Sequence, residues 1–205
     1  RAAFARAAAS AGRDSLLAVL GRTDLAPLAR LDLLRALGSK IADLRPESSA
    51  ALAEALRGNP DLATRYLALD PLAQLARSRS ATSGELTRLA EMARRDADWP
   101  VRMRAVELSA DIAPLASTVV GAASDPEPRV REAALRAIAI GKVSGGGAPA
   151  IGALANDPWT FVRVAAADAL GELARLDQVA VGVVIDVLGH LEGDQSAHAV
   201  PDQHD

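Results

Sequence analysis

The chain has 205 residues, half of them hydrophobic and 24% charged, a balance typical of a folded, soluble globular protein. No stretch approaches eighteen consecutive apolar residues free of charge, so we expect no membrane span. Cysteine is absent, which excludes disulfides and thiolate metal sites. The net charge of −3 conceals a basic first half, residues 1–105, and an acidic second half. A chain that is basic at one end and acidic at the other could bind a partner with the opposite charge distribution or stack head to tail with copies of itself. Alternatively, the difference has no function, because unequal charge in two halves of a chain is common.

The first predicted element is a helix over residues 1–12. Its apolar residues Ala3, Phe4, Ala7 and Ala8 recur at helical spacing, as in the second helix of a preceding structural unit. The chain does not begin with Met and shows no signal-peptide pattern, so we expect a fragment of a longer protein. Its location stays open, with the cytoplasm favoured, and its Ala/Arg-rich, lysine-poor composition favours a bacterial source.

An acidic residue followed six positions later by an arginine is the recurring signal in the rest of the chain. The three clearest copies read acid, short Pro-containing turn, Val, Arg and an Ala-rich apolar stretch. The same offset finds two earlier copies, in one of which Asn replaces the acid. The five pairs are Asp24 and Arg30, Asn59 and Arg65, Asp96 and Arg102, Asp125 and Arg131, and Asp157 and Arg163. Their first members, the anchors, are 35, 37, 29 and 32 residues apart, which is the range of two-helix repeats.

Each anchor marks the start of a predicted second helix. An aspartate there can accept backbone N–H bonds, and a proline in the first helical turn loses no helical hydrogen bond. Gly38, Gly141 and Gly171 stand where these helices are predicted to stop in left-handed caps. Small or aliphatic residues nine and thirteen positions after the anchors predict close packing between neighbouring second helices. The segment from Asp70 to Thr82 interrupts the pattern, as a kink or a regulatory loop would.

The clearest copy opens on Ala148-Pro149, turns at Asp157-Pro158, continues through Val162-Arg163 and closes at Gly171. It resembles a HEAT repeat, in the short bacterial form known from phycobilisome-lyase-type proteins, and the match is specific over roughly residues 83–175. The resemblance implies an all-α, right-handed α-α superhelix, a HEAT/armadillo-like solenoid of about five two-helix repeats. We expect one such domain over residues 1–192, with anchors near 24, 59, 96, 125 and 157.

The C-terminal part of the chain is less regular. Val179 to Leu191 is predicted to form another first helix, although its valine-rich composition also suits a strand. Asp194 could open a further turn, but the position six residues later is Val200 and Pro201 follows. We therefore expect residues 193–205 to be a frayed or disordered tail.

The family resemblance gives the repeated arginines a structural role. It implies that each turn acid and helix arginine take part in a ladder between adjacent repeats, which would include all ten residues of the five pairs named above. Partly exposed pairs of this kind contribute about 0.3–1 kcal/mol each. The alternative interpretation is a row of guanidinium groups that binds a ligand.

A candidate binding surface follows from the same register, because second helices of a HEAT array line its concave face. The position eleven after each anchor is always charged but never of one sign, and the position seven after it is mostly apolar. The candidate partner-binding residues in these two columns are Arg35, Tyr66, Asp70, Met103, Glu107, Glu132, Arg136 and Asp168. A stripe of apolar spots edged by charge is typical of a protein-binding groove. Equally, the apolar column could pack against the neighbouring second helix.

Catalytic, metal and cofactor sites are not indicated. The histidines His190, His198 and His204 all lie near the C-terminus, where no core would hold a metal geometry, and no Gly-x-Ser-x-Gly motif is present. The glycine run at Gly145 lacks the residues of a phosphate-binding loop and is predicted to be a connector. We therefore expect no enzyme activity and no cofactor in this segment, although a catalytic domain could lie elsewhere in a longer protein.

The function predicted from the sequence is a non-catalytic interaction or scaffold module whose partner is another protein or peptide. The first alternative is a DNA-binding or base-repair HEAT-like domain, supported by one cluster of residues: Arg88, Arg94, Arg95, Arg102, Arg104 and Trp99. The acidic second half and the presence of only two lysines oppose nucleic-acid binding. A bilin lyase-like protein is a second alternative, resting on analogy of fold alone.

Overall fold

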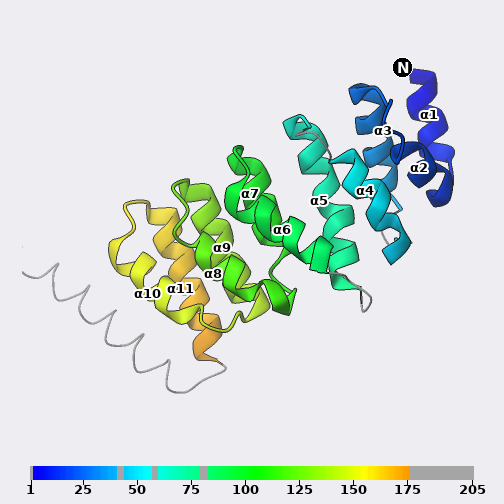
Figure 1. Ribbon diagram of the computed structural model, residues 1–205. Coiled ribbons are helices and arrows are strands. Elements are labelled where there is room, and N and C mark those ends of the chain that lie inside the picture. Colours follow the sequence, from blue (N-terminus) through cyan, green and yellow to red (C-terminus); the bar gives the residue numbers. More distant parts are fainter. Residues whose placement is uncertain (1, 41–43, 57–59, 79–82, 176–205) are drawn as a thin grey trace, which may run out of the picture.

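The computed structural model describes residues 2–40, 44–56, 60–78 and 83–175, and in this part of the chain all the regular secondary structure is helical (Figure 1). The α-helices are α1 (Ala2–Ser10), α2 (Arg13–Leu20), α3 (Pro27–Gly38), α4 (Ser49–Ala55), α5 (Leu62–Arg77), α6 (Ser83–Arg95), α7 (Trp99–Leu108), α8 (Ala116–Ala122), α9 (Pro128–Gly141), α10 (Gly147–Asn156) and α11 (Thr160–Ala174). Short 3₁₀ turns, η2 (Pro46–Ser48) and η3 (Ala113–Leu115), precede α4 and α8.

The helices form successive antiparallel hairpins. Each even-numbered helix from α2 to α10 packs against the odd-numbered helix that follows it, and every odd-numbered helix also packs against the next odd-numbered one. Figure 1 shows these pairs following one another along an elongated array in chain order. The all-α solenoid of about five two-helix repeats predicted from the sequence is therefore confirmed. Helix α1 precedes the first pair and packs on α3 in the manner of a second helix.

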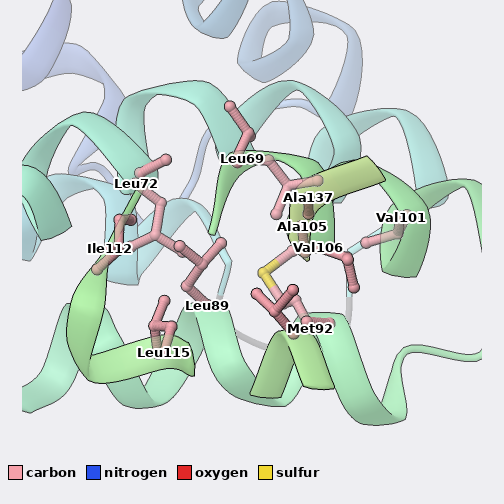
Figure 2. Packing of buried hydrophobic residues seen from close by; sticks show 14 of the residues in the cluster. Leu69, Leu72, Leu89, Met92, Val101, Ala105, Val106, Ile112, Leu115 and Ala137 are labelled. Carbon is pink, nitrogen blue, oxygen red and sulfur yellow. The ribbon is translucent and has the colours of Figure 1, made fainter. Parts of the chain in front are cut away.

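The core is continuous along the array and is built from aliphatic side chains and alanine. Second helices contribute residues such as Leu69 and Val106, and first helices contribute residues such as Leu89; all three are fully buried. Figure 2 shows these side chains together with Met92 and Leu115 among the buried residues of one cluster. Fully burying one leucine contributes about 1.5–3 kcal/mol, so a chain poor in aromatic residues still gains a stable core by repetition.

The residues in the turns explain where most of the second helices begin. Proline occupies the first turn of α3, α7 and α9, where its missing N–H costs no hydrogen bond. In α5 the Asp61 carboxylate accepts hydrogen bonds from the Thr64 N–H at 3.0 Å and from the Thr64 hydroxyl at 2.8 Å. The anchor position of that repeat, Asn59, lies outside the described residues, so its predicted role has no structural description.

The predicted glycine caps are wrong in their conformation. Helix α3 does end at Gly38, but the residue after it, Ser39, is right-handed, and Gly171 lies inside α11, which continues to Ala174. Helix α9 ends at Gly141, and the left-handed residue is Lys142 at φ 49°. These helices therefore do not share one kind of C-terminal cap.

Gly141 is required for a different reason, which is a close approach between repeats. A Cβ atom on Gly141 would lie 1.9 Å from the carbonyl oxygen of Ala110, a residue of the preceding repeat. Nothing larger than hydrogen fits at this contact. The glycine thus sets how closely the end of α9 packs against the chain that follows α7.

The predicted interruption at Asp70 to Thr82 is also corrected in part. Helix α5 continues to Arg77 and contains Pro71 in its interior, where the ring is buried. Packing on α3, α6 and α7 compensates for the hydrogen bond that proline cannot donate. Residues 79–82 lie outside the described residues, as do the predicted helix Val179 to Leu191 and the predicted tail 193–205.

Candidate functional site

Arg102 shows how the six-residue spacing of the repeat works. This arginine lies in the first turns of α7 and folds back, so that its Nη1 donates a hydrogen bond to the carbonyl oxygen of Asp96, the anchor of its own repeat, at 2.9 Å. Its Nε and Nη2 donate to Oδ2 and Oδ1 of Asp125, the anchor of the next repeat, at 2.8 and 2.9 Å. A single guanidinium group therefore bridges two consecutive turns through a bidentate ion pair.

The same arrangement recurs on both sides of Arg102. Arg131 donates to the carbonyl of Asp125 at 2.9 Å and forms a bidentate pair with Asp157 at 2.7 and 3.1 Å. Arg65 forms a bidentate pair with Asp96 at 2.8 and 3.1 Å. We call these three inter-repeat pairs, Arg65–Asp96, Arg102–Asp125 and Arg131–Asp157, the ladder.

The carboxylates of the ladder also organise their own turns. Oδ1 of Asp96, Asp125 and Asp157 accepts the backbone N–H two residues further on, at 3.0, 2.8 and 3.0 Å. This contact explains why an aspartate stands at the turn, because its short side chain can bond its own backbone two residues later. The side chains of these acids are only 6–8% exposed, so water screens the ion pairs weakly.

The electrostatic environment is resolved most clearly at Asp157. Burial of its carboxylate would raise the pKa, but the hydrogen bonds from Arg131 and from the Trp159 N–H, together with the charges of Arg131 and Arg163, outweigh burial and hold the pKa below its usual value. In the neighbouring pair, the hydrogen bonds that Arg102 donates to the Asp125 carboxylate raise the pKa of Arg102. The ladder therefore favours the charged form of these groups.

The N-terminal pair assigned from the sequence does not join the ladder as predicted. Asp24 is paired with Arg22, two residues away, at 2.7 Å, and both side chains are largely exposed. The nearby Arg22 satisfies this carboxylate locally, which removes it from any inter-repeat role. The Nε of Arg30 is buried and has no hydrogen-bond partner among the described residues, and Asn59, its predicted counterpart, is not described.

A second group of inter-repeat contacts was not found from the sequence. Arg77, at the end of α5, forms a bidentate pair with Asp111 at distances of 2.8–2.9 Å and donates to the Leu108 carbonyl at 2.7 Å. Arg104 of α7 pairs with Asp70 of α5 at 2.6 Å. Each contact occurs between one pair of repeats only, so no periodic signal in the sequence could reveal it.

The second helices present a common surface, the second-helix face, defined by the positions seven, eleven and fifteen after each anchor. At position seven, Tyr66, Met103 and Glu132 are half-buried, and Tyr66 and Met103 pack against the core. The interpretation that this column packs between helices therefore describes these two residues better than an exposed binding stripe does.

The charged column eleven residues after the anchors is more exposed. Arg35, Glu107, Arg136 and Asp168 are exposed, whereas Asp70 is half-buried under Arg104. Neighbours on the same helix hold some of these groups: Arg136 bonds Glu132 at 2.7 Å, Glu107 bonds Arg104 at 3.1 Å, and Arg35 lies 3.6 Å from Asp32. Intrahelical pairs of this kind contribute only about 0.3–0.5 kcal/mol, so a partner can displace them at small cost.

Ile140 is the feature of this face that the sequence reasoning missed. It stands fifteen residues after its anchor, in the last turn of α9, and is 78% exposed. The corresponding positions in the flanking repeats are the acids Asp111, which follows the end of α7, and Glu172, which lies in α11. Large exposed aliphatic side chains cost free energy in water, and this one lies in an interior repeat, where an incomplete end of the array does not account for it.

The basic cluster that suggested nucleic-acid binding is largely engaged elsewhere. Arg102 is a half-buried member of the ladder, Arg104 bonds Asp70 and Glu107, and Arg88 lies 4.0 Å from Glu91. Nucleic-acid affinity depends mainly on arginines and lysines that are free to meet phosphates. These contacts leave few such groups in the cluster.

Other kinds of site are not found among the described residues. No group of three or more metal-ligating side chains occurs in the part of the chain that the structure describes, and the three histidines lie outside it. None of the helices described is both long and apolar enough to cross a bilayer. The stacked hairpins and the repeated ion pairs at their turns define an α-solenoid.

Comparison with known protein families agrees with this class. Residues 86–171 match the family of HEAT repeats, so this part of the chain, from α6 to α11, consists of HEAT repeats. No curated protein matches the chain. The matched range contains two complete rungs of the ladder, Arg102–Asp125 and Arg131–Asp157.

Proposed function

We propose that the protein is a non-catalytic interaction or scaffold module that binds another protein or a peptide on its second-helix face. The observation that carries this proposal is the exposed Ile140 beside the exposed Arg136, in the middle of a rigidly tied array. Apolar anchors surrounded by polar groups are the usual composition of protein interfaces. Solenoids commonly bind partners along such extended surfaces.

The charges around Ile140 indicate the chemistry of the partner. The acid Glu107 lies on α7, Asp111 lies just after the end of α7, and Asp168 and Glu172 lie on α11. Arg104 pairs with Glu107, Arg77 with Asp111 and Arg175 with Glu172, so that Asp168 is left, among the described residues, as the exposed acid of the column without an ion pair. A segment with one apolar side chain flanked by a basic residue would complement this surface.

Ile140 is largely exposed, so we expect its replacement to leave the fold intact and to affect binding alone. We expect Ile140→Glu to abolish capture of the partner in a pull-down with the purified chain, followed by mass spectrometry. Ala155→Glu, an exposed position on α10, is the matched control and should retain the same partner. Partner capture that survives Ile140→Glu unchanged would refute the proposal.

A DNA-binding or base-repair domain is the alternative from another class, and the engagement of Arg102 and Arg104 by carboxylates weighs against it. A gel shift with plain duplex DNA at two salt concentrations separates the two functions. Retention at low salt that falls steeply as salt rises would favour DNA binding. We expect no retention at either concentration. The bilin lyase-like alternative rests on analogy of fold only, and no contact among the described residues favours it.

A further inference from the structure

Exposed apolar side chains occur on both α9 and α11, two second helices that lie side by side (Figure 1). Counted from the anchors, Ile140 at position fifteen of α9 is 78% exposed, and Val164 at position seven of α11 is 56% exposed. Phe161, at position four of α11, is half-buried, and the centre of its ring lies 5.7 Å from that of the exposed Trp159. The apolar surface around Ile140 therefore extends from α9 onto α11.

A contact at position four fixes the register between these two helices. The guanidinium carbon of Arg129, on α9, lies 4.7 Å from the centre of the Phe161 ring, on α11, so equal positions of the two helices are neighbours. Positions four, seven, eleven and fifteen follow one another on one side of a helix, over a length of about 16 Å or three turns. We call these four positions of α9 and α11 the α9–α11 face.

Charge is distributed unequally across the α9–α11 face. On α9, Arg129 and Arg136 lie 3.5 and 2.7 Å from the same half-buried acid, Glu132, so one negative charge serves two positive charges. On α11, Asp168 is exposed and has no ion pair among the described residues. A complementary partner therefore presents an acidic group toward α9 and a basic group toward α11.

A helix is the element that this fold already places against two second helices. The first helix α6 packs against both α5 and α7, and α8 packs against both α7 and α9. An α-helix satisfies its own backbone hydrogen bonds, whereas an extended segment needs backbone partners. The backbones of α9 and α11 are bonded within their helices and offer few such partners.

We propose that one amphipathic helix of the partner, about three turns long, lies along the α9–α11 face, an inference that rests on the binding function proposed for Ile140. Its apolar side covers Phe161, Val164 and Ile140. An acidic residue on one flank of this apolar side meets Arg136, and a basic residue on the other flank meets Asp168.

Photo-crosslinking from the two ends of the face distinguishes a helix from an extended segment. We replace Arg129, at position four of α9, or Glu172, at position fifteen of α11, by p-benzoylphenylalanine and irradiate each variant with the protein recovered in the pull-down. A helix covers the length of about 16 Å with about eleven residues, and an extended segment covers it with about five. We expect both variants to attach to one segment, at residues about eleven apart.

A spacing of about five residues, or attachment from fewer than both ends, would overturn the helix. Attachment to residues 176–205 of the same chain, or to a second copy, would also overturn it. The proposed function is decided separately, by the pull-down with Ile140→Glu. p-Benzoylphenylalanine at Ala155, on α10, is the matched control and should give no attachment.

A synthetic peptide with the sequence of the attached segment tests the orientation of the charges. Its circular dichroism should gain helical signal on binding to the unmodified chain. Asp168→Lys should raise the Kd of the peptide roughly tenfold, because the basic flank then meets a like charge. Glu91→Lys, a change at an exposed acid of the first helix α6, is the control and should leave the Kd unchanged. No gain of helical signal, or equal effects of the two variants, would contradict the proposal.

Discussion

Arg102 binds the carboxylate of Asp125, which belongs to the next repeat, while it donates to the backbone of its own turn. This relationship gives the regular spacing in the sequence a physical cause. The arginine stands six residues after its own anchor because from there it reaches two consecutive turns. The two side chains are only 12% and 8% exposed, so the contribution of the pair to stability depends on both partners being present.

Removing one carboxylate of the ladder should destabilise the array strongly. We expect Asp125→Asn to lower the free energy of unfolding by about 3 kcal/mol, because the largely covered guanidinium of Arg102 then loses the carboxylate with which it pairs. Urea denaturation followed by circular dichroism measures the change. The exposed Asp24, paired only with its neighbour Arg22, is the control, and Asp24→Asn should leave the midpoint unchanged. Equal effects at the two positions would contradict the role assigned to the ladder.

Replacing Gly141 and Gly152 by alanine should change the stability of the chain in opposite directions. Gly141→Ala places a Cβ against the Ala110 carbonyl, and we expect a loss of about 1–3 kcal/mol from overpacking. Gly152 lies inside α10, where a Cβ would meet no neighbouring atom within 4 Å, so Gly152→Ala should stabilise by about 0.5–1 kcal/mol through helix propensity. Thermal melts of both variants provide the measurement. A neutral Gly141→Ala would show that the close approach between repeats is not required.

The ladder predicts a loss of stability in acid. The pKa of Asp157 is lower in the folded chain than in the unfolded chain, so this carboxylate stabilises the fold above the unfolded value of about 4. Its contribution disappears as the pH falls below that value toward the lowered folded pKa. Denaturation midpoints between pH 6 and pH 3 should therefore fall less steeply in Asp157→Asn than in the unmodified chain. Parallel curves would contradict this linkage.

The second-helix face should tolerate change without loss of the fold. Ile140 is largely exposed, so Ile140→Glu should alter the free energy of unfolding by less than about 0.5 kcal/mol. Met103 lies on the same face but packs against the core, so Met103→Ala should lower the free energy of unfolding by about 2 kcal/mol. Urea denaturation of both variants distinguishes surface from core. A large loss of stability in Ile140→Glu would assign this residue to packing instead of binding.

The sequence was sufficient to predict the features that repeat. An acid and an arginine recur at the same offset in four units, with Asn59 in place of the acid in the other, so the helical hairpins and their order could be predicted from the spacing. Gly141 was assigned to a left-handed cap, because a glycine after a helix usually signals one, and only the fold brings the Ala110 carbonyl against it. The left-handed residue proved to be Lys142.

Contacts made once could not be predicted in this way. The pairs Arg77–Asp111 and Arg104–Asp70 join neighbouring repeats at positions that no other repeat uses for the same purpose. Sequence periodicity averages over units, whereas each of these contacts depends on a single pair of side chains. The exposure of Ile140 also required the fold, because a helical isoleucine near buried neighbours is more often part of the core.

The most direct test of the ladder compares two double-mutant cycles that share Asp96. The side-chain carboxylate of Asp96 accepts hydrogen bonds from Arg65 of the preceding repeat. Arg102 of the same repeat donates to the backbone carbonyl of Asp96 and not to its carboxylate. We predict a coupling energy of about 1–3 kcal/mol between Arg65→Gln and Asp96→Asn, and less than about 0.5 kcal/mol between Arg102→Gln and Asp96→Asn. A larger coupling within the repeat than between repeats would contradict the claim that these pairs hold the array together.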